Sequence, residues 1–150
     1  MQSLPDGYQY PYTDWPLHVT LADVFAIGLA GQDVVGKLAA FASQQKPFTT
    51  TAGQDTFFGP NGETRVTLID MSPELLALHN NLIDLLEDNG VVFNVPEYTR
   101  AGFLAHATVG SHGRLQQGDT VRFDSLTLID MFPDQDPYQR KVLGTYTFVG

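Results

Sequence analysis

The pentapeptide Thr-Leu-Ile-Asp-Met occupies residues 67–71 and recurs at residues 127–131, and in each copy a proline follows two residues later. A second echo precedes each copy, because His18-Val19-Thr20 recurs as His106-Ala107-Thr108. Short strand segments rich in Leu and Ile can recur by chance. Two echoes in the same order instead favour two related lobes, of which the second has lost or shortened its helix.

Hydrophobic periodicity around these motifs predicts two helices and about seven strands. One helix is expected at Asp33–Gln45. The other begins after Ser72 as N-cap, with Pro73 in its first turn, and ends at Asn89-Gly90. Strands are expected at Pro16–Phe25, Thr49–Phe58, Glu63–Met71, Val91–Val95, Phe103–Val109, Thr120–Met131 and Lys141–Val149. The strands mostly do not alternate with helices, so the pattern predicts an α+β domain with antiparallel sheet.

Length and composition narrow the class of protein. The 150 residues are expected to form one domain, 1–150, with an ordinary content of hydrophobic (43%) and charged (17%) residues. No apolar run is long enough for a membrane span, Met1–Trp15 lacks the features of a signal peptide, and cysteine is absent, so a cytoplasmic protein is expected. The formal net charge of −9 argues against binding of long duplex or single-stranded nucleic acid but leaves room for a small nucleotide or a strand end. No leftover apolar stripe suggests an interface, and a monomer is expected.

The duplicated His-x-Thr motif carries the chemistry. Residues i and i+2 of a strand point to the same face, so each motif would present an imidazole beside a hydroxyl while its apolar neighbours pack on the core. If two such strands meet in one cleft, a neutral histidine can accept a proton from a nucleophile while a protonated one donates to the leaving oxygen. The threonine hydroxyls can hold non-bridging phosphate oxygens. A single His-x-Thr is weak evidence, but two copies among four histidines predict a metal-independent, cofactor-free phosphodiesterase.

His18-Val19-Thr20-Leu21 and His106-Ala107-Thr108-Val109 resemble the paired motifs of the 2H phosphoesterase superfamily, which includes 2′-5′ RNA ligase-like proteins and cyclic nucleotide phosphodiesterases. The resemblance runs from about Pro16 to the C-terminus, and the segments 126–131 and 144–148 are similar to the family's final hairpin. It implies a bilobal α+β fold: two antiparallel sheets related by pseudo-two-fold symmetry, helices packed outside and a central cleft. It also implies that His18 and His106 form the acid–base pair and that Thr20 and Thr108 bind phosphate oxygens. The substrate would be a 2′,3′-cyclic phosphate or a 2′-5′ bond of a nucleotide or RNA end.

The sequence departs from the family pattern at both ends of the motif pair. Met1–Trp15 is a poor match for the apolar strand that usually precedes the first motif. The second motif ends in Val109, and Gly110-Ser111 intervenes before His112 and Arg114. These departures bear on the substrate more than on the chemistry.

Three further residues are candidates for substrate binding. His112 could reach the phosphate or be solvated, and Arg114 could hold two phosphate oxygens, although most surface arginines are solvated. Tyr12 belongs to an aromatic cluster with Tyr8, Tyr10 and Trp15 that could stack on a base or pack on the body of the protein. His79, inside the leucine-striped helix, is expected to be structural. A metal site built from His18, His106 and His112 lacks ligand spacing of a recognised kind, so no metal is expected.

Two other functions fit the same residues. The chain could be a non-catalytic module that binds nucleotides or phosphorylated ligands in the same cleft. It could also be an esterase or lyase that acts on a non-nucleotide phosphodiester. This alternative differs from the predicted nucleotide phosphodiesterase only in its substrate.

Overall fold

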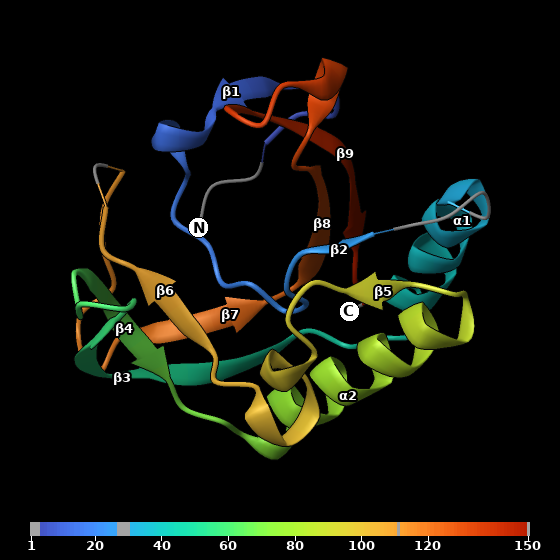
Figure 1. Ribbon diagram of the computed structural model, residues 1–150. Coiled ribbons are helices and arrows are strands. Elements are labelled where there is room, and N and C mark those ends of the chain that lie inside the picture. Colours follow the sequence, from blue (N-terminus) through green and yellow to red (C-terminus); the bar gives the residue numbers. More distant parts are fainter. Residues whose placement is uncertain (1–3, 27–30, 111, 150) are drawn as a thin grey trace.

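The computed structural model describes residues 4–26, 31–110 and 112–149 and has an α+β fold (Figure 1). The helices are α1 (Gly31–Ala42) and α2 (Pro73–Asp88). The strands are β1 (Gln9–Pro11), β2 (Phe25–Ala26), β3 (Phe48–Phe58), β4 (Thr64–Ile69), β5 (Val92–Phe93), β6 (His106–Thr108), β7 (Thr120–Phe123), β8 (Ser125–Asp130) and β9 (Gln139–Thr147). No helix in these ranges is long and apolar enough to cross a membrane.

All strand pairs are antiparallel and form three sheets. The largest has the order β6-β4-β3-β7, the second the order β1-β9-β8, and β2 pairs with β5. The two Thr-Leu-Ile-Asp-Met copies therefore have different neighbours. The copy in β4 lies between β6 and β3, whereas the copy in β8 lies at a sheet edge beside β9.

The predicted helix after Ser72 is confirmed as α2, and the predicted pair of strands around residues 59–62 is confirmed as the β3–β4 hairpin. The Ser72 hydroxyl accepts a hydrogen bond from the Leu75 amide at 3.2 Å, which satisfies one of the free N–H groups of the first turn. At the other end the chain turns through Gly90, whose φ of 78° is readily adopted only by glycine. The predicted helix Asp33–Gln45 is confirmed as α1, with shifted ends.

One hydrophobic core joins the helices to the sheets. α2 contributes the buried side chains of Leu75, Leu78, Leu82, Ile83 and Leu86. The same cluster includes Ile69 of β4, Phe123 of β7 and Leu126 of β8, so the two larger sheets share it. In Figure 1, α2 lies along one side of the four-stranded sheet, and α1 lies near β9, against which it packs.

The predicted strand Pro16–Phe25 is wrong except at its end, since only Phe25 and Ala26 pair, with Phe93 and Val92. The alternation was still informative, because Val19 and Leu21 pack against the core. Residues 16–24 nevertheless join none of the sheets in the described part of the chain, because a strand also needs to lie alongside a partner strand. In Figure 1 this segment descends from β1 toward the four-stranded sheet before it turns to β2.

Two other strand predictions need correction. Residues 9–11 form a strand, β1, which pairs with β9 and buries Tyr10, so the expectation that no strand precedes the first motif is wrong. The predicted strand Thr120–Met131 is two strands, because the chain changes partner at Asp124. Phe123 pairs with Phe48 of β3, and Ser125 pairs with Thr147 of β9.

Candidate active site

The second His-x-Thr motif lies on β6, at the edge of the four-stranded sheet. His106 pairs with Leu68 and Thr108 with Val66 of β4, so these side chains share one face. Ala107 and Thr67 pair with each other on the opposite face and are fully buried. The alternation predicted for this motif is confirmed, with His106 half-buried and Thr108 exposed.

His106 is held in a defined orientation. Its Nδ1 lies 2.8 Å from the carbonyl oxygen of Leu104, and its ring meets the Phe58 ring edge-to-face at 4.8 Å. A carbonyl oxygen only accepts hydrogen bonds, so Nδ1 carries the proton and Nε2 is the nitrogen available to a ligand.

The first motif has the same local contact on an irregular segment. Nδ1 of His18 lies 2.7 Å from the carbonyl oxygen of Pro16, again two residues earlier, and its ring stacks on Trp15 at 4.7 Å and 30°. His18 is half-buried and Thr20 is exposed. The two motifs therefore share one way of orienting an imidazole, although only one of them lies in a strand.

Burial is the main influence on His18. It lowers the pKa of the His18 imidazole below the usual 6.5, while the hydrogen bond to Pro16 partly opposes this shift. The charge of His106 lowers the same pKa further. Burial and the charge of His106 thus both favour the neutral form of the His18 imidazole.

Arg140 of β9 was not identified from the sequence, although it borders the first motif. Its guanidinium lies over the rings of Trp15 (5.6 Å) and Tyr12 (5.9 Å), so Trp15 is in contact with both Arg140 and His18. Arg140 Nη1 donates to three carbonyl oxygens, those of Met131, Pro137 and Gln139. No local signal in the sequence links this arginine to residues 12–18.

Tyr12 lies at the exposed end of this aromatic group. Its side chain is 45% exposed, and its ring is 5.8 Å from that of Tyr138. Tyr10, by contrast, packs edge-on against Trp15 and is buried, which raises the pKa of its phenol to about 12. Tyr12 and Tyr8 (43% exposed) are thus the exposed tyrosines of this group, and base stacking on Tyr12 stays a prediction.

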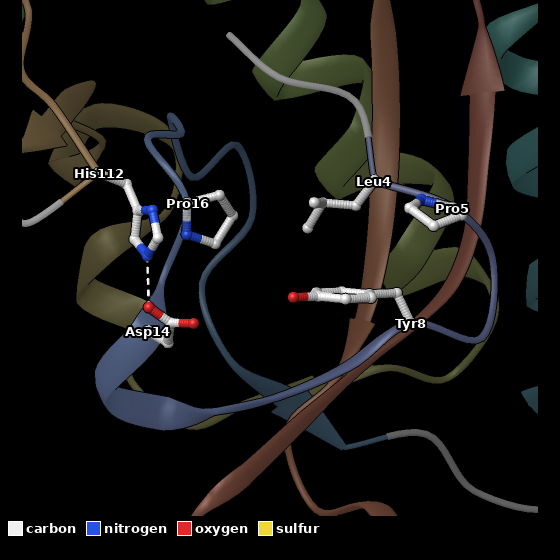
Figure 2. A pocket seen from close by; sticks show the side chains of 6 residues that line it. All are labelled: Leu4, Pro5, Tyr8, Asp14, Pro16 and His112. Atoms are coloured by element: carbon white, nitrogen blue, oxygen red, sulfur yellow. Dashed lines mark hydrogen bonds and ion pairs between the residues drawn. The ribbon is translucent and has the colours of Figure 1, made fainter.

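His112 follows the second motif and reaches the segment that precedes the first. Its Nε2 contacts the Asp14 carboxylate (Figure 2). The pair borders a cavity of about 200 Å³, lined by Leu4, Pro5, Tyr8, Asp14, Pro16 and His112. Figure 2 shows Tyr8 and Leu4 on the other side of this cavity. A contact between His112 and phosphate stays a prediction.

Arg114 is engaged within the protein. Its Nη2 donates to both carboxylate oxygens of Asp55, at 2.7 and 2.8 Å, and lies 3.3 Å from the Thr67 hydroxyl. These hydrogen bonds, with those from Thr67 and Arg65, lower the pKa of Asp55 to about 2. Arg114 thereby connects Asp55 of β3 with Thr67 of β4. A contact between Arg114 and phosphate stays a prediction.

In the three ranges that the structure describes, no group of three or more His, Asp and Glu side chains could hold a metal ion. His18, His106 and His112 therefore do not form a ligand set there.

Comparison with known families identifies the chain. A family model described as the 2′-5′ RNA ligase superfamily matches residues 1–125. The match begins earlier than the motif resemblance suggested, since it includes the aromatic N-terminal segment, and it ends before most of β8. A comparison with curated proteins found no match. With five sixths of its length matched, this chain belongs to the 2′-5′ RNA ligase superfamily, which is the 2H phosphoesterase superfamily.

Proposed function

We propose that this protein is a cytoplasmic, monomeric, single-domain phosphodiesterase that acts on a small nucleotide or an RNA end. Its substrate bears a 2′,3′-cyclic phosphate or a 2′-5′ bond, and His18 and His106 are its acid–base pair. They lie in a bilobal fold whose related halves face a central cleft. Superfamily membership supports phosphoesterase or ligase-type chemistry, and the substrate and the roles of the residues are the proposal.

One observation carries the assignment of the histidines. Both imidazoles donate from Nδ1 to the carbonyl oxygen two residues earlier, at 2.7 and 2.8 Å. This bond leaves Nε2 of each ring as the reactive nitrogen and fixes its direction. Acid–base catalysis needs such a fixed orientation, because a proton moves only to a group within hydrogen-bond reach.

His18 is the base in this proposal. Burial and the charge of His106 lower the pKa of His18, so His18 is neutral near pH 7 and can accept a proton. In hydrolysis of a cyclic phosphate, Nε2 of His18 takes a proton from water as the water oxygen bonds to phosphorus. The bond from phosphorus to one ribose oxygen breaks, and protonated His106 gives its proton to that oxygen. Exchange with solvent then restores both histidines.

The remaining predicted residues bind the substrate. The hydroxyls of Thr20 and Thr108 donate to the non-bridging phosphate oxygens, whose charge changes in the transition state. Tyr12 stacks on a base, and the imidazole of His112 and the guanidinium of Arg114 add contacts to the phosphate.

The test is an assay with EDTA present on 2′,3′-cyclic nucleotides and 2′-5′ and 3′-5′ dinucleotides. His18→Ala and His106→Ala are each expected to lower turnover by roughly 10²–10⁴-fold, the usual contribution of a positioned acid or base. Lys46→Ala, at an exposed lysine, is the matched control and should keep full turnover. Near-full activity of either histidine variant would refute the assignment. Binding of a nucleotide by wild type without any product would instead favour the non-catalytic module.

A further inference from the structure

His79 of α2 is a buried titratable side chain that the proposed mechanism does not use. Its exposed fraction is 1%, and both of its ring nitrogens have partners. Nδ1 donates to the carbonyl oxygen of Leu21 at 2.7 Å, and Nε2 accepts from the backbone N–H of Arg100 at 2.9 Å. The ring also stacks on Phe103 at 3.8 Å and 6°. Only the neutral imidazole with its proton on Nδ1 satisfies both hydrogen bonds.

The partners of His79 belong to the two segments that carry the histidine motifs. Leu21 directly follows Thr20, and its side chain packs against the core. Arg100 and Phe103 precede His106 and lead the chain into β6. One imidazole therefore contacts both segments, from a helix that packs on the core.

Few other hydrogen bonds connect the first motif to the rest of the protein. Within the described chain, residues 16–23 make no backbone–backbone hydrogen bond, and the next such bond joins Val24 to Asn94. The bond of His18 to Pro16 is local and cannot place the segment. The hydrogen bond from His79 to Leu21 is thus a polar contact that fixes the first motif relative to α2.

The second segment depends on α2 in a different way. Arg100 has a φ of 57°, a left-handed conformation that costs free energy in a residue other than glycine. Two contacts with α2 hold it there: its N–H donates to His79, and its guanidinium pairs with Asp84 (2.7 Å) and Glu87 (3.4 Å). Loss of the His79 acceptor would remove the hydrogen bond of the Arg100 N–H and leave this strained residue with one contact to α2 fewer.

We propose that His79 is a positioning residue whose neutral ring sets the two histidine motifs relative to each other and whose protonation releases them. A proton on Nε2 would point at the N–H of Arg100, where a hydrogen bond requires an acceptor. The inference rests on the proposed function for its effect on turnover, but the positioning itself can be measured without substrate.

The charges around His79 favour the neutral ring near pH 7. Burial lowers its pKa, and the positive charge of Arg100 lowers it further, whereas the hydrogen bond to Leu21 opposes the shift. Asp84 and Glu87 face the Arg100 guanidinium and partly neutralise it. Acidification is therefore required to charge His79.

Two variants separate positioning from simple stability. His79→Gln keeps an amide that can donate and accept, whereas His79→Leu keeps volume but no hydrogen bond. Leu82→Ala is the matched control, since Leu82 is a core side chain of the same helix, 4% exposed, that has no hydrogen-bonding group. His79→Leu is expected to lower kcat by roughly 10–100-fold, because small displacements of catalytic groups have effects of this size. His79→Gln should recover most of this loss, and Leu82→Ala should lower stability with little change in kcat.

The substrate-free measurement is NMR of the imidazoles of His18 and His106 together with amide exchange at Arg100. In His79→Leu both imidazole signals should move and Arg100 exchange should accelerate at least tenfold. In wild type the protection factor of the Arg100 amide, which corrects for the slower intrinsic exchange in acid, should fall at least tenfold on acidification before global unfolding, but not in His79→Gln. Unchanged imidazole signals of His18 and His106 in His79→Leu would overturn the inference. An unchanged protection factor of the Arg100 amide in acid would also overturn it. Wild type without turnover on every substrate would refute the proposed function and leave this measurement valid. If His79→Leu does not fold, the wild-type and His79→Gln exchange data decide.

Discussion

Replacement of Trp15 by alanine is expected to lower kcat/KM. It should also shift the acidic side of the pH–activity profile to higher pH. Trp15 stacks on His18 at 4.7 Å and lies 5.6 Å from the Arg140 guanidinium, so the variant removes the surface on which His18 rests. A stacked aromatic pair contributes about 0.5–1.5 kcal/mol beyond its burial. If the whole amount is lost in the transition state, kcat/KM falls by about 2- to 13-fold at pH 8.

The pH dependence has a defined sign. Burial is the largest cause of the lowered pKa of His18, so removal of the indole raises this pKa toward 6.5. His18 must be neutral to act as the base, and the variant therefore begins to lose activity at a higher pH as the solution is acidified. The fold-loss relative to wild type should be larger at pH 5.5 than at pH 8.

The assay is hydrolysis of a 2′,3′-cyclic nucleotide in EDTA from pH 4.5 to 8.5. Trp15→Phe is the control, since a phenyl ring keeps part of the stack, and its profile should lie between those of wild type and Trp15→Ala. If the pH at which Trp15→Ala loses activity on acidification is unchanged or lower than in wild type, burial does not control the pKa of His18.

Three predictions concern stability. Thr67→Val should lower the free energy of unfolding by about 1–3 kcal/mol in urea titrations, because it leaves the contacts of the buried hydroxyl with Asp55 and Leu115 unmade; Thr67→Ser should lose less, and equal loss would argue against the hydroxyl. Gly102→Ala should cost at least about 1–3 kcal/mol, because the added Cβ would lie 1.7 Å from the carbonyl oxygen of Glu97; a variant with the Tm of wild type would show that this turn shifts freely. Stability should fall as pH drops below about 6.5, because His18 and His79 have lowered pKa values and the unfolded chain binds protons that the folded chain does not. Asp55, with a pKa of about 2, is still ionised at pH 5, so urea titrations at pH 5 and 7.5 isolate the histidines, and His79→Gln should reduce the difference.

Much of the fold could be predicted because its signals are local. Ser72, Pro73 and Asn89-Gly90 act within a turn or two of the helix, and they defined α2 without any knowledge of its surroundings. Alternation defined β3, β4 and the side chains of β6, and the two short His-x-Thr motifs pointed to the superfamily that the family match confirms.

Other features depended on residues far apart in the chain. Residues 16–24 have the alternation of a strand, yet whether they lie alongside a partner strand depends on the tertiary arrangement, and they join none of the described sheets. The residues next to an arginine in the sequence likewise do not determine which side chain it contacts in the fold. Arg114 contacts Asp55 of β3, and Arg140 lies over Trp15 at the opposite end of the sequence.

The sequence by itself thus determined which residues could carry the chemistry, and the tertiary structure decided what surrounds them. Helix caps and strand alternation are set by interactions within a few residues, which a sequence displays directly. The stack of His18 on Trp15 and the two hydrogen bonds of His79 depend on how distant segments pack into one core, because a side chain's partners and desolvation follow from the position of the whole chain.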